Sequence, residues 1–133
     1  MLGEQLGEIR GKRSMRRVIP VDGGIKVEVS FEESGKMLGI DVMNFGTYNS
    51  SMRHDGSLYG EGQGGLMGQD GSMATWKGSG VGKLQGGGAV SFRGAVCYST
   101  SSAKFARLNT VAGIFEHEVD AEGNTHTKIW EWK

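Results

Sequence analysis

Residues 60–64 read Gly-Glu-Gly-Gln-Gly and residues 78–82 read Gly-Ser-Gly-Val-Gly, so glycine occupies every second position in both segments. Successive side chains of a β-strand point to opposite faces, and alternate glycines therefore leave one face of each segment without side chains. Such strands can bend sharply, and large neighbouring side chains can lie across the empty face. The pattern predicts a strongly curved, closed sheet.

The composition indicates one folded, glycine-rich domain. Glycine fills 24 of the 133 positions, more than twice its average share of about 7%, and it lacks the three-residue period of collagen. Three Trp, five Phe and seven Met supply apolar side chains for a core, and the length is normal for one domain. We therefore expect residues 1–133 to form a single β-barrel domain.

Turn-forming residues divide the chain into long strand-like segments. The turns are expected at Asp22-Gly23-Gly24, Ser34-Gly35, Asp55-Gly56, Asp70-Gly71, Gly86-Gly87-Gly88 and Glu122-Gly123. They separate eight predicted strands, at about 4–18, 25–33, 36–49, 57–69, 72–84, 89–101, 110–120 and 124–132. Long consecutive antiparallel strands tend to close and so remove exposed edges. The sequence predicts an all-β, eight-stranded antiparallel up-and-down β-barrel, with a two-sheet sandwich as the alternative.

Two places have the spacing of a short helix. Leu2, Leu6 and Ile9 are three or four positions apart, as on one face of a helix. The segment Ala103–Leu108 is a second candidate, and a helix there could cap one end of the barrel. We therefore allow for one short helical segment beside the strands.

Several motifs together resemble a known group of proteins. These motifs are Gly60-Glu61-Gly62-Gln63-Gly64, Trp76-Lys77-Gly78, Arg93-Gly94, Leu108-Asn109 and Phe115-Glu116-His117-Glu118-Val119-Asp120. They resemble an uncharacterised bacterial family of allene-oxide-cyclase-like barrels, which have a calycin-like shape and are related to lipocalin and dirigent proteins. The resemblance covers most of the chain. It implies an eight-stranded antiparallel barrel, and it carries no established activity or catalytic residue over to this chain.

The turn at Asp70-Gly71 suggests which side chains line the interior. A two-residue turn there would pair Glu61 with Gly80, and opposed residues share a face. The other face would carry Lys77 and Lys83, which mark it as the solvent side. The inward face would then hold the candidate ligand-binding residues Tyr59, Glu61, Gln63 and Trp76.

A two-residue turn at Gly86-Gly87 would add Arg93 to the inward face. Glu61 and Arg93 would then flank Gly80, and their side chains could meet over this empty position. A buried carboxylate and guanidinium must pair to be tolerated, and such a pair would anchor a small ligand. Cys97 would also face inward. An outward apolar stripe would be left for a partner subunit, formed by Val90, Phe92, Val96 and Tyr98.

A three-residue turn at Gly86-Gly87-Gly88 would reverse this arrangement, because one extra residue moves every side chain of the strand at 89–101 to the opposite face. Arg93 would then be a surface residue. The core would be filled instead by Val90, Phe92, Val96 and Tyr98. Both registers stay open at this point.

The last hairpin has a clearer register. Residues 120–124 have the form of a type I turn followed by a glycine in the left-handed region. Closing it sets Glu116 opposite Lys128 and Glu118 opposite His126, so that opposite charges meet. His117 then shares a face with apolar residues, and such a histidine is more often a hydrogen-bonded core residue than a catalytic base. Trp130 and Trp132 lie on the other face, and either face could be the inner one.

Other sites are not expected. Residues 60–65 match G-x-G-x-x-G, but no helix pattern follows, and the three histidines lack metal-ligand spacing. The five basic residues between Arg10 and Arg17 lack the aromatic neighbours typical of nucleic-acid-binding surfaces, and fifteen acidic residues balance fifteen basic ones overall. We expect no cofactor, no metal, no nucleic acid and no membrane partner.

The cellular compartment is suggested by what the chain contains. Cys97 is the only cysteine, which suits a reducing compartment. The first thirteen residues lack the apolar segment of a secretory signal, and no stretch approaches the roughly 18 apolar residues of a membrane span. We therefore expect a cytoplasmic protein.

Three functions fit this sequence. The first is the binding of a small hydrophobic or amphipathic ligand inside the barrel, by the candidate residues Tyr59, Glu61, Gln63, Trp76 and Arg93. The second is a cofactor-independent isomerase or cyclase with Glu61 or Glu116 as acid or base, which rests on fold analogy alone. The third is a structural homo-oligomer without a ligand. Ligand binding ranks first.

Overall fold

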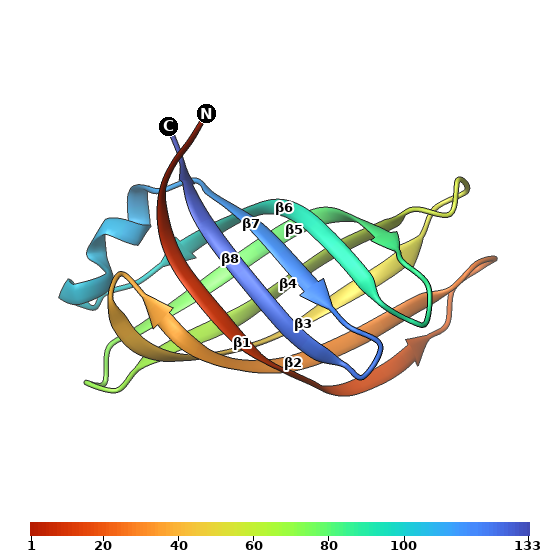
Figure 1. Cartoon of the computed structure of the whole chain (residues 1–133), viewed down its shortest axis with the longest axis horizontal. Coiled ribbons are helices and arrows are strands. Elements are labelled where there is room, and N and C mark those ends of the chain that lie inside the picture. The colour runs from red at the N-terminus through yellow and green to blue at the C-terminus, as the bar shows by residue number, and fades with distance from the viewer.

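The computed structural model describes residues 1–133 and confirms the expected fold, a closed antiparallel barrel of eight strands in chain order (Figure 1). The strands are β1 (Leu2–Ile19), β2 (Lys26–Met37), β3 (Ile40–Met52), β4 (Leu58–Gly68), β5 (Met73–Leu84), β6 (Val90–Ser99), β7 (Gly113–Val119) and β8 (Asn124–Trp132). Each strand pairs with its sequence neighbour, and β1 also pairs with β8. No strand edge therefore remains exposed.

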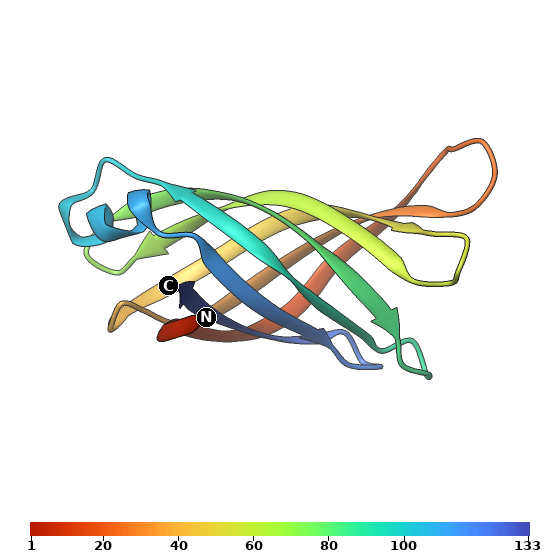
Figure 2. The same ribbon diagram turned by 90° about the horizontal axis from the view of Figure 1, so that it is seen from above.

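One short helix closes one end of the barrel. The 3₁₀ helix η1 (Ala103–Thr110) links β6 to β7 and confirms the second helical candidate, whereas residues 2–9 belong to β1. Figures 1 and 2 show η1 at one end of the long axis, opposite the turns β1–β2, β3–β4, β5–β6 and β7–β8. Phe105 and Leu108 of η1 are 0% exposed and pack into the main core cluster. No helix in the structure has the length and apolar composition needed to cross a membrane.

Inward-facing glycines make room for aromatic rings, as the alternating pattern predicts. A Cβ atom at Gly46 or Gly64 would collide with the indole of Trp76, which lies across both positions. A Cβ atom at Gly82 would likewise collide with the ring of Phe92, and one at Gly94 with the ring of Phe115. The glycine face thus allows a narrow barrel to hold large rings.

The turn between β4 and β5 contains three residues rather than two. The Gly68 amide donates to the Ser72 carbonyl at 2.8 Å, and Gly71 has φ +89°, as in a type I turn followed by a left-handed glycine. Glu61 therefore pairs with Ser79 instead of Gly80. The expected inward orientation was wrong for three of the candidate residues, since the extra residue turns outward the side chains of Tyr59, Glu61 and Gln63.

The turn between β5 and β6 also contains three residues. Gln85 donates to the Ala89 carbonyl at 2.9 Å, and the three glycines between them all have positive φ. Arg93 therefore pairs with Val81 and is exposed, as is Cys97, so the inward register expected from a two-residue turn was wrong. The alternative register is confirmed, because the stripe from Val90 to Tyr98 faces the interior, with Phe92 and Val96 buried.

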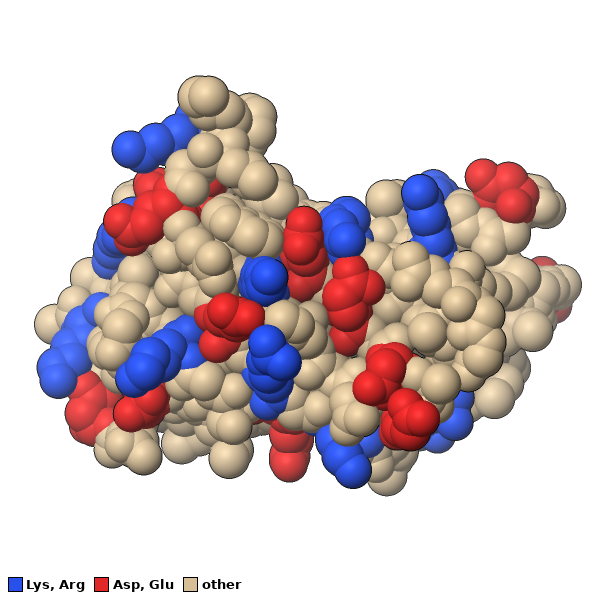
Figure 3. Space-filling model, in the orientation of Figure 1, with Lys and Arg blue, Asp and Glu red and all other residues tan.

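The predicted register of the last hairpin is confirmed. Glu116 lies opposite Lys128 and Glu118 opposite His126. These side chains are on the outer surface, where acidic and basic groups lie next to each other over the face seen in Figure 3. His117 consequently points into the barrel and is buried.

Candidate functional site

A cavity of about 80 Å³ lies inside the barrel and is partly open to solvent. Its walls are glycine backbone, a few aliphatic side chains and the six rings of Phe31, Tyr48, Trp76, Phe92, Tyr98 and Phe115. Drug-sized sites measure roughly 300–1,000 Å³, whereas one water molecule fills about 30 Å³. The space therefore suits only a small molecule and is too small for a lipid.

A polar cluster occupies one wall of this cavity. Glu33 of β2 lies opposite Asn44 of β3, and His117 of β7 lies opposite Thr127 of β8. Strand β1 runs between β2 and β8, and its Gly11 pairs with Glu33 on one side. Because Gly11 has no side chain, the Glu33 carboxylate can reach across β1 to Thr127. Four strands are thereby joined by one set of side chains.

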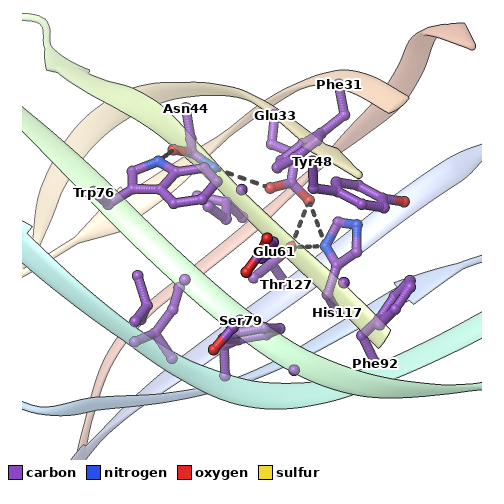
Figure 4. A pocket seen from close by; sticks show the side chains of 18 of the residues that line it. Phe31, Glu33, Asn44, Tyr48, Glu61, Trp76, Ser79, Phe92, His117 and Thr127 are labelled. Atoms are coloured by element: carbon purple, nitrogen blue, oxygen red, sulfur yellow. Dashed lines mark hydrogen bonds and ion pairs between the residues drawn. The ribbon is translucent and has the colours of Figure 1, made fainter. Parts of the chain in front are cut away.

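The cluster forms a directed chain of hydrogen bonds (Figure 4). Trp76 Nε1 donates to Asn44 Oδ1 at 2.8 Å, and Asn44 Nδ2 donates to Glu33 Oε1 at 3.3 Å. Thr127 Oγ1 donates to Glu33 Oε2 at 2.7 Å, and His117 Nδ1 lies 2.6 Å from Thr127 Oγ1. Because an indole N–H can only donate, it fixes which way the Asn44 amide faces. Both arms of the chain end on the Glu33 carboxylate.

The state of His117 follows from that of Glu33. When Glu33 is ionised, the Thr127 hydroxyl donates to it, the Thr127 oxygen accepts from Nδ1–H of His117, and neutral His117 then has a lone pair on Nε2. Burial lowers the pKa of His117 to about 4, so the ring is neutral near pH 7. Nε2 is buried without a hydrogen-bond partner, and Figure 4 shows the ring next to Tyr48. This nitrogen has no hydrogen-bond partner, and His117 is one of the residues that line the cavity.

Glu33 is a carboxylate in an unusual position. The residue is only 2% exposed, and the one basic side chain within 4.0 Å of its carboxylate is that of the neutral His117, whose Nδ1 lies 4.0 Å from Oε2. Burial raises the pKa of Glu33, and the hydrogen bonds donated by Thr127 and Asn44 oppose that rise. A buried carboxylate without a nearby cation is costly, and groups with such perturbed pKa values concentrate at functional sites.

Tyr48 adds a hydroxyl donor beside the cluster. Its ring centroid lies 6.0 Å from that of His117 and 5.5 Å from that of Phe92. Burial raises the pKa of Tyr48 to about 12, so its hydroxyl keeps its proton under ordinary conditions. The site therefore combines one free acceptor with a protonated phenol.

The residues expected to bind a ligand do not come together. Trp76 lines the cavity, and Glu61 borders it between two glycines with an exposed side chain. Tyr59 donates to Glu61 at 3.2 Å on the outer surface, and Gln63 is also exposed there. Arg93 makes outer ion pairs with Glu118, at 2.7 Å, and Glu116, at 3.6 Å. The expected Glu61–Arg93 pair over Gly80 is thus absent, and Glu116 also faces outward.

Three members of the polar cluster were not singled out from the sequence, namely Glu33, Asn44 and Thr127. A signal for Glu33 was present, because the alternation of Ile25, Val27, Val29 and Phe31 places residue 33 on the same face. Thr127 likewise follows from the predicted last hairpin, where it lies opposite His117. Asn44 had no comparable signal.

Comparisons with known proteins support the barrel. No protein-family model and no curated protein matches the sequence. A protein of unknown function from Clostridium acetobutylicum ATCC 824 has a similar structure, with TM-score 0.82, 14% identity and 96% of each chain covered. A β-barrel-like protein from Acinetobacter baumannii AYE has TM-score 0.81 and 13% identity over 100% of this chain and 96% of that one.

A third similar structure is an enzyme from Penicillium herquei, with TM-score 0.70 and 17% identity over 96% of this chain and 92% of that one. At such low identities, these likenesses establish the fold alone. The resemblance to the allene-oxide-cyclase-like family stays a prediction.

Proposed function

We propose that the barrel binds a small, flat and mostly apolar molecule with one hydroxyl or N–H group, which donates a hydrogen bond to His117 Nε2. The single observation that carries this proposal is that His117 lines the cavity and its Nε2 is buried without a partner, whereas Nδ1 of the same ring is bonded. A buried polar atom without a partner costs about 1–3 kcal/mol. A ligand donor would remove that cost.

The cavity walls favour a single ring over a chain. Phe31, Tyr48 and His117 form a triangle of rings, in which the centroids of Phe31 and Tyr48 lie 5.0 and 6.0 Å from that of His117 and 5.9 Å from each other. Aromatic pairs in offset or edge-on contact add about 0.5–1.5 kcal/mol beyond their buried area. The cavity of about 80 Å³ is smaller than the roughly 150 Å³ of an apolar cavity that binds benzene, so a ligand of one ring would extend from it toward the open end of the barrel.

A ligand would reach this site from the end of the barrel opposite η1. Tyr48, Phe92 and His117 lie in the halves of their strands that lead to the turns of that end, whereas Phe105 and Leu108 fill the opposite end. A ligand entering there would meet the two rings and His117 first. The ring-lined space beneath them would hold its apolar part.

Binding of 4-nitrophenol, compared with nitrobenzene, tests the proposal. Equilibrium dialysis should detect binding of 4-nitrophenol and weaker binding of nitrobenzene, which has the same ring without a hydroxyl. Gly78→Val should abolish the binding of both, because Gly78 lines the cavity and a Cβ there meets nothing closer than 3.2 Å. Thr75→Val on the outer surface is the matched control. Equal binding by the Gly78→Val variant, or no binding of 4-nitrophenol by the unmodified protein, would refute the proposal.

The other two functions have lost most of the residues on which they rested. An isomerase or cyclase could not use the outward-facing Glu61 or Glu116 on a ligand inside the barrel, so any acid–base chemistry there needs other groups. The homo-oligomer was expected to form through the stripe from Val90 to Tyr98 or through Trp130 and Trp132, and the stripe lies inside the barrel. Trp132 is exposed, and self-association stays a prediction that sedimentation would test.

A further inference from the structure

His117, Thr127 and Glu33 form an unbroken row of groups that can both give and accept a proton. The distances are 2.6 Å from Nδ1 to Oγ1 and 2.7 Å from Oγ1 to Oε2. The row has two proton arrangements with the same heavy-atom positions. In one, Glu33 is a carboxylate and Nε2 has a lone pair; in the other, Glu33 is a carboxylic acid and Nε2 carries hydrogen.

We propose that His117, Thr127 and Glu33 act as a proton relay that ionises the acidic hydroxyl of a phenol or enol bound in the cavity. This inference rests on the proposed function and extends it from binding to acid–base chemistry. His117 would contact the ligand, whereas Thr127 and Glu33 would act through it. The chemical class of ligand follows from the free acceptor, which needs a donor with an acidic proton.

The step balances without any other reactant. The ligand O–H bond breaks and its proton bonds to Nε2, the Nδ1 proton passes to Thr127 Oγ1, and the Thr127 proton passes to Glu33 Oε2. The negative charge moves from Glu33 to the ligand oxygen, and nothing is oxidised or reduced. An enolate formed in this way can take the proton back at carbon, which completes a keto–enol isomerisation.

Burial explains why a relay is better suited to this site than His117 alone. Proton uptake by His117 alone would leave a charged ring in an apolar cavity, and burial lowers the pKa of His117 to about 4. The relay leaves His117 neutral and converts Glu33 to a neutral acid, a form that burial favours. Both groups therefore end the step in the state that their surroundings stabilise.

The groups that would hold the product lie beside the relay. The Tyr48 ring packs edge-on against His117, and its hydroxyl stays protonated because burial raises its pKa to about 12. Asn44 remains bonded to Trp76 and Glu33 throughout, so it keeps the carboxyl group in place. The relay thus has a fixed end at Glu33 and an open end at His117.

The absorption spectra of bound nitrophenols test the relay. Nitrophenols of increasing acidity are added one at a time, all at the same pH, which is chosen below the pKa of each free compound. The absorption spectrum then shows whether the bound compound is a phenol or a phenolate. In the unmodified protein the bound probes should be largely phenolate, increasingly so for the more acidic members. Glu33→Gln should bind them as neutral phenols, because the final proton acceptor is gone. Thr127→Val, which interrupts the row and keeps its shape, should do the same.

Glu32→Gln is the matched control, because Glu32 is the neighbouring carboxylate on the outer surface, and it should leave the phenolate spectrum unchanged. Circular dichroism establishes that each variant is folded; if Glu33→Gln is not, Thr127→Val carries the comparison. Bound but neutral nitrophenols in the unmodified protein would overturn the relay and leave the binding proposal standing. A phenolate spectrum retained in a folded Thr127→Val or Glu33→Gln variant would also overturn it. Absence of any binding would overturn both.

Discussion

Glu33 of β2 and Thr127 of β8 are 94 positions apart, yet the Thr127 hydroxyl donates to the Glu33 carboxylate at 2.7 Å across an intervening strand. The contact crosses β1 at Gly11, which pairs with Glu33 and with Thr125. A position without a side chain therefore allows two non-adjacent strands to share a hydrogen bond inside the barrel.

Gly11→Ala should destabilise the barrel by about 1–3 kcal/mol, the usual cost of overpacking. A Cβ at Gly11 would lie 2.6 Å from Glu33 Cα and would also collide with the Glu32 carbonyl oxygen, and backbone cannot move aside cheaply. Urea unfolding measures the loss. Gly78→Ala is the control, since its nearest neighbour is 3.2 Å away, and equal stability of the two variants would contradict the prediction.

Trp76→Phe should destabilise the protein by about 1–3 kcal/mol, because it leaves the buried Asn44 Oδ1 without its donor. The indole N–H is the only donor to that oxygen among the hydrogen bonds of the structure. Trp132→Phe, at an exposed position, should change stability by no more than about 0.5 kcal/mol. Thermal or urea unfolding of the two variants compares them directly. Similar losses would show that the Trp76–Asn44 bond does not stabilise the fold.

The free energy of unfolding should decrease at acidic pH because of His117. Its pKa falls from 6.5 to about 4 on folding, so the unfolded chain binds more protons between these values, and stability must fall as the pH drops through that window. The loss from this group alone approaches about 3 kcal/mol. Glu33 acts in the opposite direction, because its raised pKa makes the folded state bind the extra proton.

Comparison with His117→Gln isolates the histidine, since Glu33 is present in both proteins. Urea unfolding between pH 6.5 and 4 should show a steeper loss of stability for the unmodified protein. Parallel curves would mean that the ring is not buried in its neutral form.

Arg93→Ala should have little effect on stability, about 0.2–1 kcal/mol, since exposed ion pairs contribute no more than that. Its partners Glu116 and Glu118 are themselves about 40% exposed, and added salt should reduce the difference further. Binding of 4-nitrophenol should not change. Loss of 4-nitrophenol binding in this variant would contradict the prediction. It would mean that Arg93 faces the cavity, as expected from a two-residue turn at Gly86-Gly87.

The fold could be predicted because it depends on local patterns. Two-residue alternation, glycine-containing turns and strand length indicate the number, order and antiparallel closure of the strands. The last hairpin was also predicted correctly, because residues 120–124 match one turn type that has one register. The local sequence was therefore sufficient to predict strand pairing wherever it fits only one turn geometry.

The candidate site could be predicted only in part, because a single residue in a turn decides which face is inside. Asp70-Gly71 fits a two-residue and a three-residue turn equally well, and the difference moves Glu61 from the cavity to the surface. Trp76 and His117 were identified, whereas Glu33 and Thr127 meet only because β1 closes against both β2 and β8. The sequence of each strand, by its alternation, determines how the strand divides its side chains between two faces. Which of those side chains lie at the same height in the barrel is decided only when the barrel closes, because their relative heights depend on the registers of all eight strands together.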